Sequence, residues 1–203
     1  MTNATIELMT YERTSFDFEA MLDDQRKFAK EVDGIDLNPD GLKLPAIRSG
    51  FGWGLWTPQG WTAQREYEAT AAMGIEVSKY TNDSLDIAVP KNNRTATGGQ
   101  YLVLCRAGQE ADEQMRGISA NDVNARGLNT MPLAERLRLG RWFYWKTGQH
   151  LDVRDWTRCA GSRDSGGGVP CVRFSGGGVH VRWSSPGGDF GSIRARETVS
   201  AIG

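Results

Sequence analysis

The sequence predicts an α+β fold, in which a helix- and loop-containing N-terminal part precedes a C-terminal antiparallel sheet packed on one central helix. A strong helical pattern over 132–146 is followed by four short runs with the alternation typical of strands. Glycine supplies 25 of the 203 residues and separates those runs, which indicates tight turns. No linker-like segment divides the chain, so we expect a single domain, 1–203, whose natural subdivision would be 1–128 and 129–203.

The N-terminal segment contains a strand pattern and then a helix pattern. Residues 5–11 alternate loosely between apolar and polar side chains, which predicts a strand. Ser15 is the expected N-cap of a helix that runs to about Val32. Gly34 should end this helix, because glycine readily adopts the left-handed conformation found at helix C-termini.

The next segment, residues 34–61, holds three prolines and six glycines without any period, which predicts a long ordered loop. Trp53 and Trp56 form an aromatic cluster there with Phe51 and Trp61. Such a cluster suits a stacking or binding surface, so both tryptophans are candidate binding residues. The alternative is that the cluster forms a small satellite core that pins the loop.

The middle of the chain contains one further helix and short strand patterns. Thr62 is the expected cap of a helix that closes at Gly74. Three short runs then predict strands, at residues 75–80, 85–89 and 101–105.

The clearest helix pattern runs from Pro132 to about Lys146. Thr130 is its expected cap, and proline suits the first turn because its missing N–H would be unpaired there anyway. Apolar side chains surround most of the C-terminal end, so we expect this helix to lie at the centre of the core. Strands are expected after it near 152–159, 169–174, 178–183 and 192–197.

Charge is distributed unevenly along the chain. Residues 1–90 carry 15 acidic and 8 basic side chains, whereas residues 91–203 carry 10 acidic and 16 basic ones. Only Lys91 and Lys146 among those 16 are lysines. Arginine forms planar, bidentate contacts with carboxylates and phosphates, so the C-terminal half is suited to anionic partners.

Alternation within the C-terminal strands places five basic side chains on one expected sheet face. They are Arg173, His180, Arg182, Arg194 and Arg196. Like charges on neighbouring strands repel one another, so something anionic should cover them. Carboxylates from the acidic N-terminal half are one candidate, a polyanion such as nucleic acid is a second, and a small anion or an acidic protein is a third.

The cysteines and histidines do not match a metal site. Cys105, Cys159 and Cys171 are an odd number of cysteines, which argues against a disulfide framework. His150 and His180 could join the last two cysteines, but no two of these four residues are close enough in sequence for a structural zinc site. We therefore expect buried thiols, no metal, no cofactor and no catalytic cysteine.

The segment Asp164-Ser165-Gly166-Gly167 resembles the nucleophile motif of trypsin-like serine proteases. Those enzymes need a histidine in an alanine-histidine-cysteine context far upstream, whereas His150 lies only fifteen residues before Ser165. A tight turn between strands explains the same residues, so we assign no catalytic residue here.

The last forty-five residues resemble the closing strands of bacterial and phage C-type-lectin-like domains, which include the formylglycine-generating-enzyme-like group. The resemblance rests on Ser162-Arg163, on the run from Val172 to Val179, and on Ser192-Ile193-Arg194-Ala195-Arg196. It implies a ligand-binding fold that displays variable surface residues, usually without catalysis. The upstream tryptophan-arginine-leucine-proline helix motif of that family is absent.

These observations favour a non-catalytic binding or assembly protein that uses an arginine-rich sheet face, in a phage or virion setting. A single-stranded nucleic-acid-binding protein is the first alternative, and an enzyme whose site cannot be read from sequence is the second. The expected partner is anionic, either protein carboxylates or nucleic acid, and a homo-oligomer is possible. No apolar run is long enough for a bilayer, and the N-terminus has no signal-peptide pattern, so we expect no membrane partner and residence in a cytoplasm or a virion.

Overall fold

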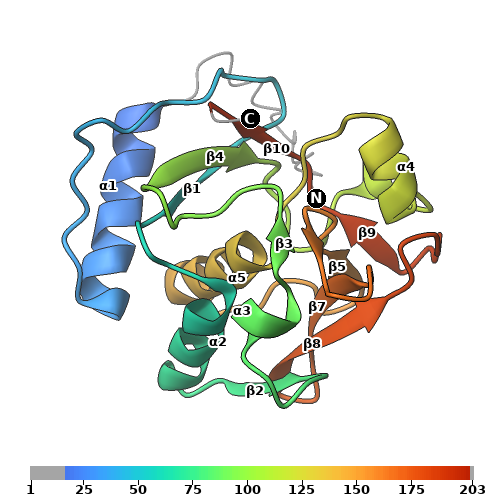
Figure 1. Cartoon of the computed structure of the whole chain (residues 1–203). Coiled ribbons are helices and arrows are strands. Elements are labelled where there is room, and N and C mark those ends of the chain that lie inside the picture. Colours follow the sequence, from blue (N-terminus) through green and yellow to red (C-terminus); the bar gives the residue numbers. More distant parts are fainter. Residues whose placement is uncertain (1–16, 202–203) are drawn as a thin grey trace, which may run out of the picture.

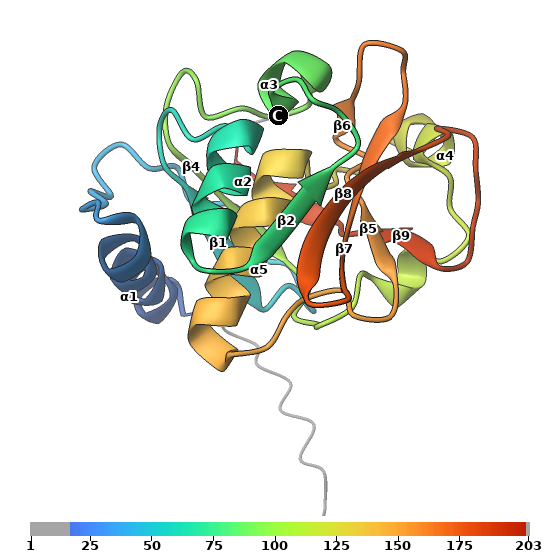
Figure 2. The same ribbon diagram turned by 90° about the horizontal axis from the view of Figure 1, so that it is seen from below.

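The computed structural model describes residues 17–201 and confirms the α+β class (Figure 1). The expected strand at 5–11 and the expected cap Ser15 lie outside the described residues. Helix α5, Leu133–Thr147, lies between two sheets, because it contacts strand β1 of one sheet and strand β7 of the other (Figure 2).

The first two helices follow their local signals. Helix α1, Phe18–Phe28, continues as a π-helical turn and ends at Gly34, whose φ is 68°. Its cap is Asp17, which accepts a hydrogen bond from the Ala20 N–H. Helix α2, Ala63–Ala72, begins as expected at Thr62, whose hydroxyl accepts from the Arg65 N–H.

A three-stranded sheet contains β1, Trp53–Thr57, β4, Tyr101–Cys105, and β10, Thr198–Ser200. Strand β4 is central and pairs with both neighbours in antiparallel register. The expectation of a loop throughout 34–61 was wrong, because β1 lies inside that segment. Its glycines and prolines concealed a strand that forms by pairing with the fully buried β4.

The second sheet has five strands in the order β2-β8-β7-β5-β9. Its centre is antiparallel, as expected, and consists of β8, Gly178–Ser184, β7, Val169–Ser175, and β5, Trp156–Arg158. The edge strands β2, Glu76–Lys79, and β9, Ile193–Ala195, run parallel to their neighbours, so the whole sheet is mixed. Residues on both sides of position 128 contribute strands to both sheets.

Several short elements complete the chain. Residues 85–89 were expected to form a strand, but Leu85–Ala88 form helix α3, because the Ser84 hydroxyl accepts from the Asp86 N–H and starts a helical turn. Strands β3, Lys91–Asn92, and β6, Ser162–Arg163, form a two-stranded ribbon. The 3-10 helix η2, Glu113–Met115, and helix α4, Ala120–Ala125, precede α5.

Helix α5 begins in a way that the sequence did not reveal. Pro132 occupies the N-cap position, and Thr130 does not cap the helix. The Leu133 N–H instead donates to the hydroxyl of Ser162, 2.9 Å away. A side chain from strand β6 therefore accepts a hydrogen bond from the first backbone N–H of the central helix.

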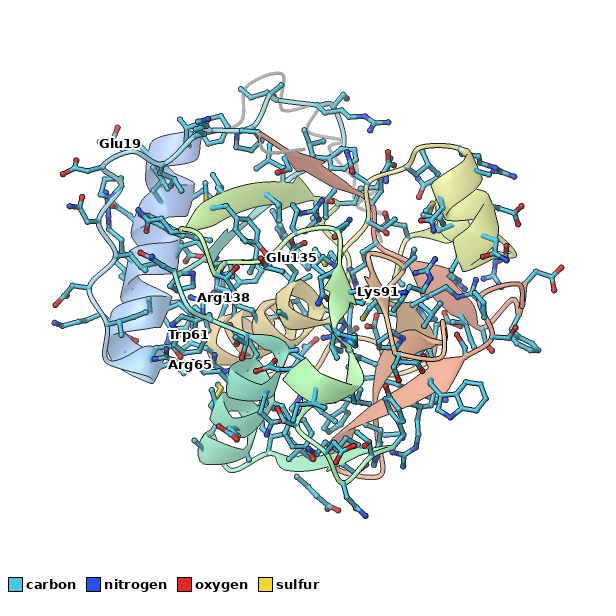
Figure 3. All side chains as sticks on the ribbon, viewed as in Figure 1. Glu19, Trp61, Arg65, Lys91, Glu135 and Arg138 are labelled. Atoms are coloured by element: carbon cyan, nitrogen blue, oxygen red, sulfur yellow. The ribbon has the colours of Figure 1, made fainter. Side chains whose placement is uncertain are left out.

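Helix α5 also carries charged side chains into the interior. Glu135 receives two hydrogen bonds from Arg94, and both side chains are buried. Arg138, which Figure 3 labels together with Glu135, and Arg141 both form ion pairs with Asp33 and Glu66. Buried charges are tolerated only when they are paired, so each of these side chains ties α5 to another segment.

Asp152 forms the third of these buried links. Its carboxylate accepts from Arg136 at 2.7 Å and from Arg196 at 2.8 Å, and it also accepts from the hydroxyl of Thr157. Burial alone would raise the pKa of Asp152, but Arg136 and Arg196 outweigh burial and hold that pKa below its ordinary value.

We expect Asp152→Asn to destabilise the fold by about 3–5 kcal/mol, because two buried guanidinium groups lose their counter-charge. Asparagine tolerates the backbone φ of 56° at this position, so the change tests charge and not backbone strain. Urea unfolding measures the loss. Asp36→Asn is the control, since Asp36 forms only an exposed ion pair with Lys30 and should change stability by about 0–1 kcal/mol.

The stability of the wild-type protein and that of Asp152→Asn should also depend differently on pH. Because the pKa of Asp152 is lowered by folding, its contribution is present above the ordinary carboxyl pKa of about 4 and is lost as pH falls through the folded value. The wild-type protein should therefore lose more stability on acidification than Asp152→Asn. Parallel pH dependences for the two proteins would contradict this assignment.

Candidate anion-binding face

Two of the expected surface arginines are internal structural residues. Arg196 is fully buried and bonds to Asp152 and to the backbone carbonyls of Gly108 and Gln109. Arg194 is also buried and forms ion pairs with Glu113 and Asp155.

The expectation that these two arginines share the exposed face was therefore wrong. Strand β9 ends at Ala195, so Arg196 lies beyond the alternating strand. The register of β9 on β5 places Arg194 beside Thr157, which pairs with Val172 on the α5 side of the sheet. The carboxylates that pair with both arginines come from the C-terminal half and not from the acidic N-terminal half.

The other three residues do lie together. Arg173 pairs across the strands with His180, and His180 also pairs with Ser78 on β2. Their neighbours Val172 and Val181 are fully buried in the core cluster that includes α5 residues. Since successive side chains point to opposite sides of a strand, these residues and Arg182 point away from α5. We call this surface, made of Ser78, Arg173, His180 and Arg182, the cationic face.

Hydrogen bonds hold the imidazole of His180 at both nitrogens. Its Nε2 lies 2.8 Å from the backbone carbonyl oxygen of Ser175, and its Nδ1 lies 2.7 Å from Ser78 Oγ. A carbonyl oxygen can only accept, so Nε2 carries the hydrogen. In the neutral ring Nδ1 is then an acceptor, and the Ser78 hydroxyl donates to it.

Both arginines of the cationic face lack a carboxylate partner among residues 17–201. Arg173 donates to the carbonyl of Val153 at 3.1 Å, and its buried Nε has no partner there. Arg182 is exposed and donates to the carbonyl of Val181 and to Ser78 Oγ, at 3.2 Å and 3.3 Å. Glu76, two residues before Ser78, is the nearest carboxylate along β2 and is exposed.

One end of the same sheet side is covered and the other is open. Arg158, beyond Arg173 on this side, is fully buried and donates to the carbonyls of Ile118 and Gly188. The segments around α4 and after β8 therefore cover that end. Trp183, the residue after Arg182, is 60 % exposed, but strand alternation directs it to the opposite side of β8 from Arg182.

The two candidate tryptophans do not form a binding surface. Trp56 is fully buried and its indole N–H donates to Gln100. Trp53 packs edge-on against Trp142, with ring centroids 5.4 Å apart, and also contacts Phe143. The binding assignment was wrong because both side chains pin the segment, as the alternative predicted: Trp53 packs on the core cluster beside α5, and Trp56 is fully buried on the other side of β1, where its backbone N–H donates to Gln25 of α1.

The cysteines and histidines are dispersed. The three cysteines are free and buried, and burial raises the pKa of Cys105 to about 12. His150 stacks between Tyr144 and Phe174, and burial together with Arg136 lowers its pKa. Within residues 17–201 no three potential metal-binding side chains come together.

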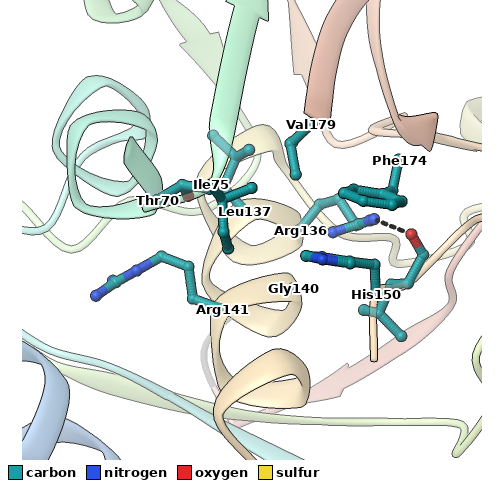
Figure 4. A pocket seen from close by; sticks show the side chains of 10 residues that line it. Thr70, Ile75, Arg136, Leu137, Gly140, Arg141, His150, Phe174 and Val179 are labelled. Carbon is teal, nitrogen blue, oxygen red and sulfur yellow. Dashed lines mark hydrogen bonds between the residues drawn. The ribbon is translucent and has the colours of Figure 1, made fainter. Parts of the chain in front are cut away.

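Two cavities lie apart from the cationic face. The cavity beside Gly140, Arg136 and His150 has a volume of about 10 Å³, which is room for one water at most (Figure 4). A larger one of about 320 Å³ lies between residues 41–43 and 95–102. Among residues 17–201, Lys43 is the one charged side chain that lines this cavity, so the described lining lacks the converging charges of the cationic face.

The protease-like segment is a turn. The Asp164 carboxylate accepts from the N–H groups of Gly166 and Gly168, which explains the spacing of these residues without catalysis. The histidine nearest to it upstream, His150, is held in its aromatic stack.

Comparisons of the chain with family models, with curated proteins and with solved structures find no match. The resemblance to C-type-lectin-like domains therefore stays a prediction. No helix within residues 17–201 has the length and apolar character needed to cross a bilayer.

Ser78 is the residue of this site that the sequence did not indicate. Alternation within residues 75–80 gives the side of the strand on which Ser78 lies. Its neighbour, however, is a strand about a hundred residues later, and nothing in either segment specifies that parallel pairing.

We expect the buried and exposed arginines to respond differently to the same change. Arg196→Gln should destabilise the fold by about 3–5 kcal/mol, because Asp152 and two carbonyls lose a buried partner. Arg182→Gln should stay within about 0.5 kcal/mol of wild type, as is usual at exposed positions. Urea unfolding of both variants is the measurement, and similar losses would contradict the division.

The thiols should be protected while the chain is folded. Because burial raises the pKa of all three cysteines, few thiolates are available near neutral pH. Ellman's reagent should react slowly with native protein and rapidly with all three thiols in guanidinium chloride. Rapid reaction of one native thiol would show that its segment opens.

Proposed function

We propose that this chain is a binding or assembly protein that contacts an anionic partner through the cationic face. The observation that supports the proposal is that Arg173 and Arg182 have no carboxylate partner within residues 17–201, whereas Arg194 and Arg196 do. Unpaired guanidinium groups on a rigid sheet are prearranged for carboxylate or phosphate oxygens.

The first candidate partner is a protein surface with exposed carboxylates. Arg173 and Arg182 lie on adjacent strands, β7 and β8, so their separation is set by the register of the sheet and not by a mobile loop. Such a partner could be another protein or a second copy of the chain, whose residues 1–90 are acidic. Self-association and residence in a cytoplasm or a virion stay predictions.

Single-stranded nucleic acid is the second candidate, because its phosphates can accept hydrogen bonds from the same two guanidinium groups. Trp183 is exposed, but strand alternation directs it to the opposite side of β8 from Arg182, so it is not part of the cationic face. Nucleic-acid binding depends steeply on salt, because phosphate contacts release bound cations. Salt dependence therefore separates the two partners.

The decisive experiment compares two double variants with the same change in charge. Arg173→Gln/Arg182→Gln removes the guanidinium groups of the cationic face. Arg126→Gln/Arg154→Gln removes two exposed arginines elsewhere. Binding to fluorescent oligothymidylate and to poly-glutamate is measured at several salt concentrations.

We expect the first variant to lose at least about tenfold in affinity for one of the two probes, and the control to keep it. If that probe is oligothymidylate, two lost phosphate contacts should reduce the salt slope by about 1.4. Equal losses in both variants, or no binding of either probe by the wild-type protein, would contradict the proposal.

A further inference from the structure

We infer that Ser78 is a nucleophile that His180 activates, so the cationic face can accept an acyl group from a small activated ester. This goes beyond the proposed binding function, which requires no reaction. Three groups form a chain of hydrogen bonds that supports this inference. The Ser78 hydroxyl is the nucleophile, the His180 imidazole is the base, and the Ser175 carbonyl orients that base.

The base has the required tautomer. The carbonyl of Ser175 holds the hydrogen of His180 on Nε2, which leaves the lone pair of Nδ1 directed at Ser78 Oγ, 2.7 Å away. A serine is a weak nucleophile until a neighbouring base removes its proton, and the third group keeps that base in position. The backbone carbonyl takes here the part that a carboxylate takes in many hydrolases.

The pair is held by the sheet. Ser78 and His180 are register partners in the parallel pairing of β2 and β8, so both Cα atoms are fixed by backbone hydrogen bonds. Gly178 permits this close pairing, because a Cβ there would lie 3.0 Å from the carbonyl oxygen of Glu76. Both side chains are only partly buried, so a small reagent can reach the Ser78 hydroxyl.

Arg182 can stabilise the charge that develops during attack. Its Nη1 lies 3.3 Å from Ser78 Oγ, so an oxygen on the carbon that bonds to Oγ would lie close to a guanidinium donor. Glu76 is an exposed carboxylate on the same side of β2 as Ser78. It should repel substrates that place a negative charge next to it.

The reaction has two balanced steps. Ser78 Oγ bonds to the acyl carbon while its proton passes to His180 Nδ1, and the ester's alcohol leaves with that proton. Water then attacks the acyl-serine, His180 takes a proton from the water, and Ser78 Oγ leaves and recovers it. The products are an alcohol and a carboxylic acid, and the protein returns to its starting state.

The test uses a neutral fluorophosphonate, which phosphonylates activated serines and releases fluoride. Labelling of the folded full chain is followed by intact mass, and the modified peptide is then identified. We expect a single adduct on Ser78, none in Ser78→Ala, and a rate at least about a hundredfold lower in His180→Gln. Circular dichroism verifies that each variant is folded.

Ser175→Ala is the matched control, at a serine on the adjacent strand β7. The inference uses only the backbone carbonyl of Ser175, so loss of its hydroxyl should leave the labelling rate unchanged. An adduct on another serine, labelling that persists at the same rate in His180→Gln, or no labelling of the folded wild-type chain would overturn the inference.

The substrate class rests on the proposed anion binding and is tested apart from the nucleophile. The nitrophenyl monoester of a dicarboxylic acid should acylate Ser78 faster than neutral nitrophenyl acetate, and Arg173→Gln/Arg182→Gln should abolish that preference. Labelling by the neutral reagent without any preference for the anionic ester would support the nucleophile and contradict the anionic substrate.

Discussion

The structure depends on the pairing of buried charges along helix α5. About two turns of this central helix, residues 135–141, present four charged side chains to the interior, and each finds a partner from another segment. Glu135 meets Arg94, Arg136 meets Asp152, and Arg138 and Arg141 meet Asp33 and Glu66. An unpaired charge in these places would be costly, so the turn after α1, helix α2, the segment after β3 and the loop before β5 must all reach α5 in one arrangement.

The same requirement decides which arginines remain available for a partner. Arg194 and Arg196 form ion pairs with Asp155 and Asp152 near β9, at one edge of the five-stranded sheet, and are therefore not available to a partner. At the other edge no described carboxylate reaches Arg173 or Arg182. The uneven charge of the chain is thus neutralised locally in one part of the sheet and left open in another.

The open part of the sheet is also where an edge strand from the N-terminal half joins the C-terminal hairpin. Strand β2 brings Ser78 to His180, and the last residue of β7 brings the Ser175 carbonyl to the other side of the ring. Binding groups and a reactive hydroxyl are therefore adjacent because one parallel pairing places them together. The proposed binding function and the inferred acyl transfer use this one surface through different atoms.

Local rules determined the elements whose ends depend on nearby residues: α1 up to Gly34, α2 from Thr62, and the β7–β8 hairpin. Alternation correctly grouped Arg173, His180 and Arg182, because side-chain direction in a strand follows from sequence parity. Parity does not say which side is covered or which strand is adjacent. Only tertiary packing could therefore bury Arg194 and Arg196, form β1 against β4, and set Ser78 beside His180.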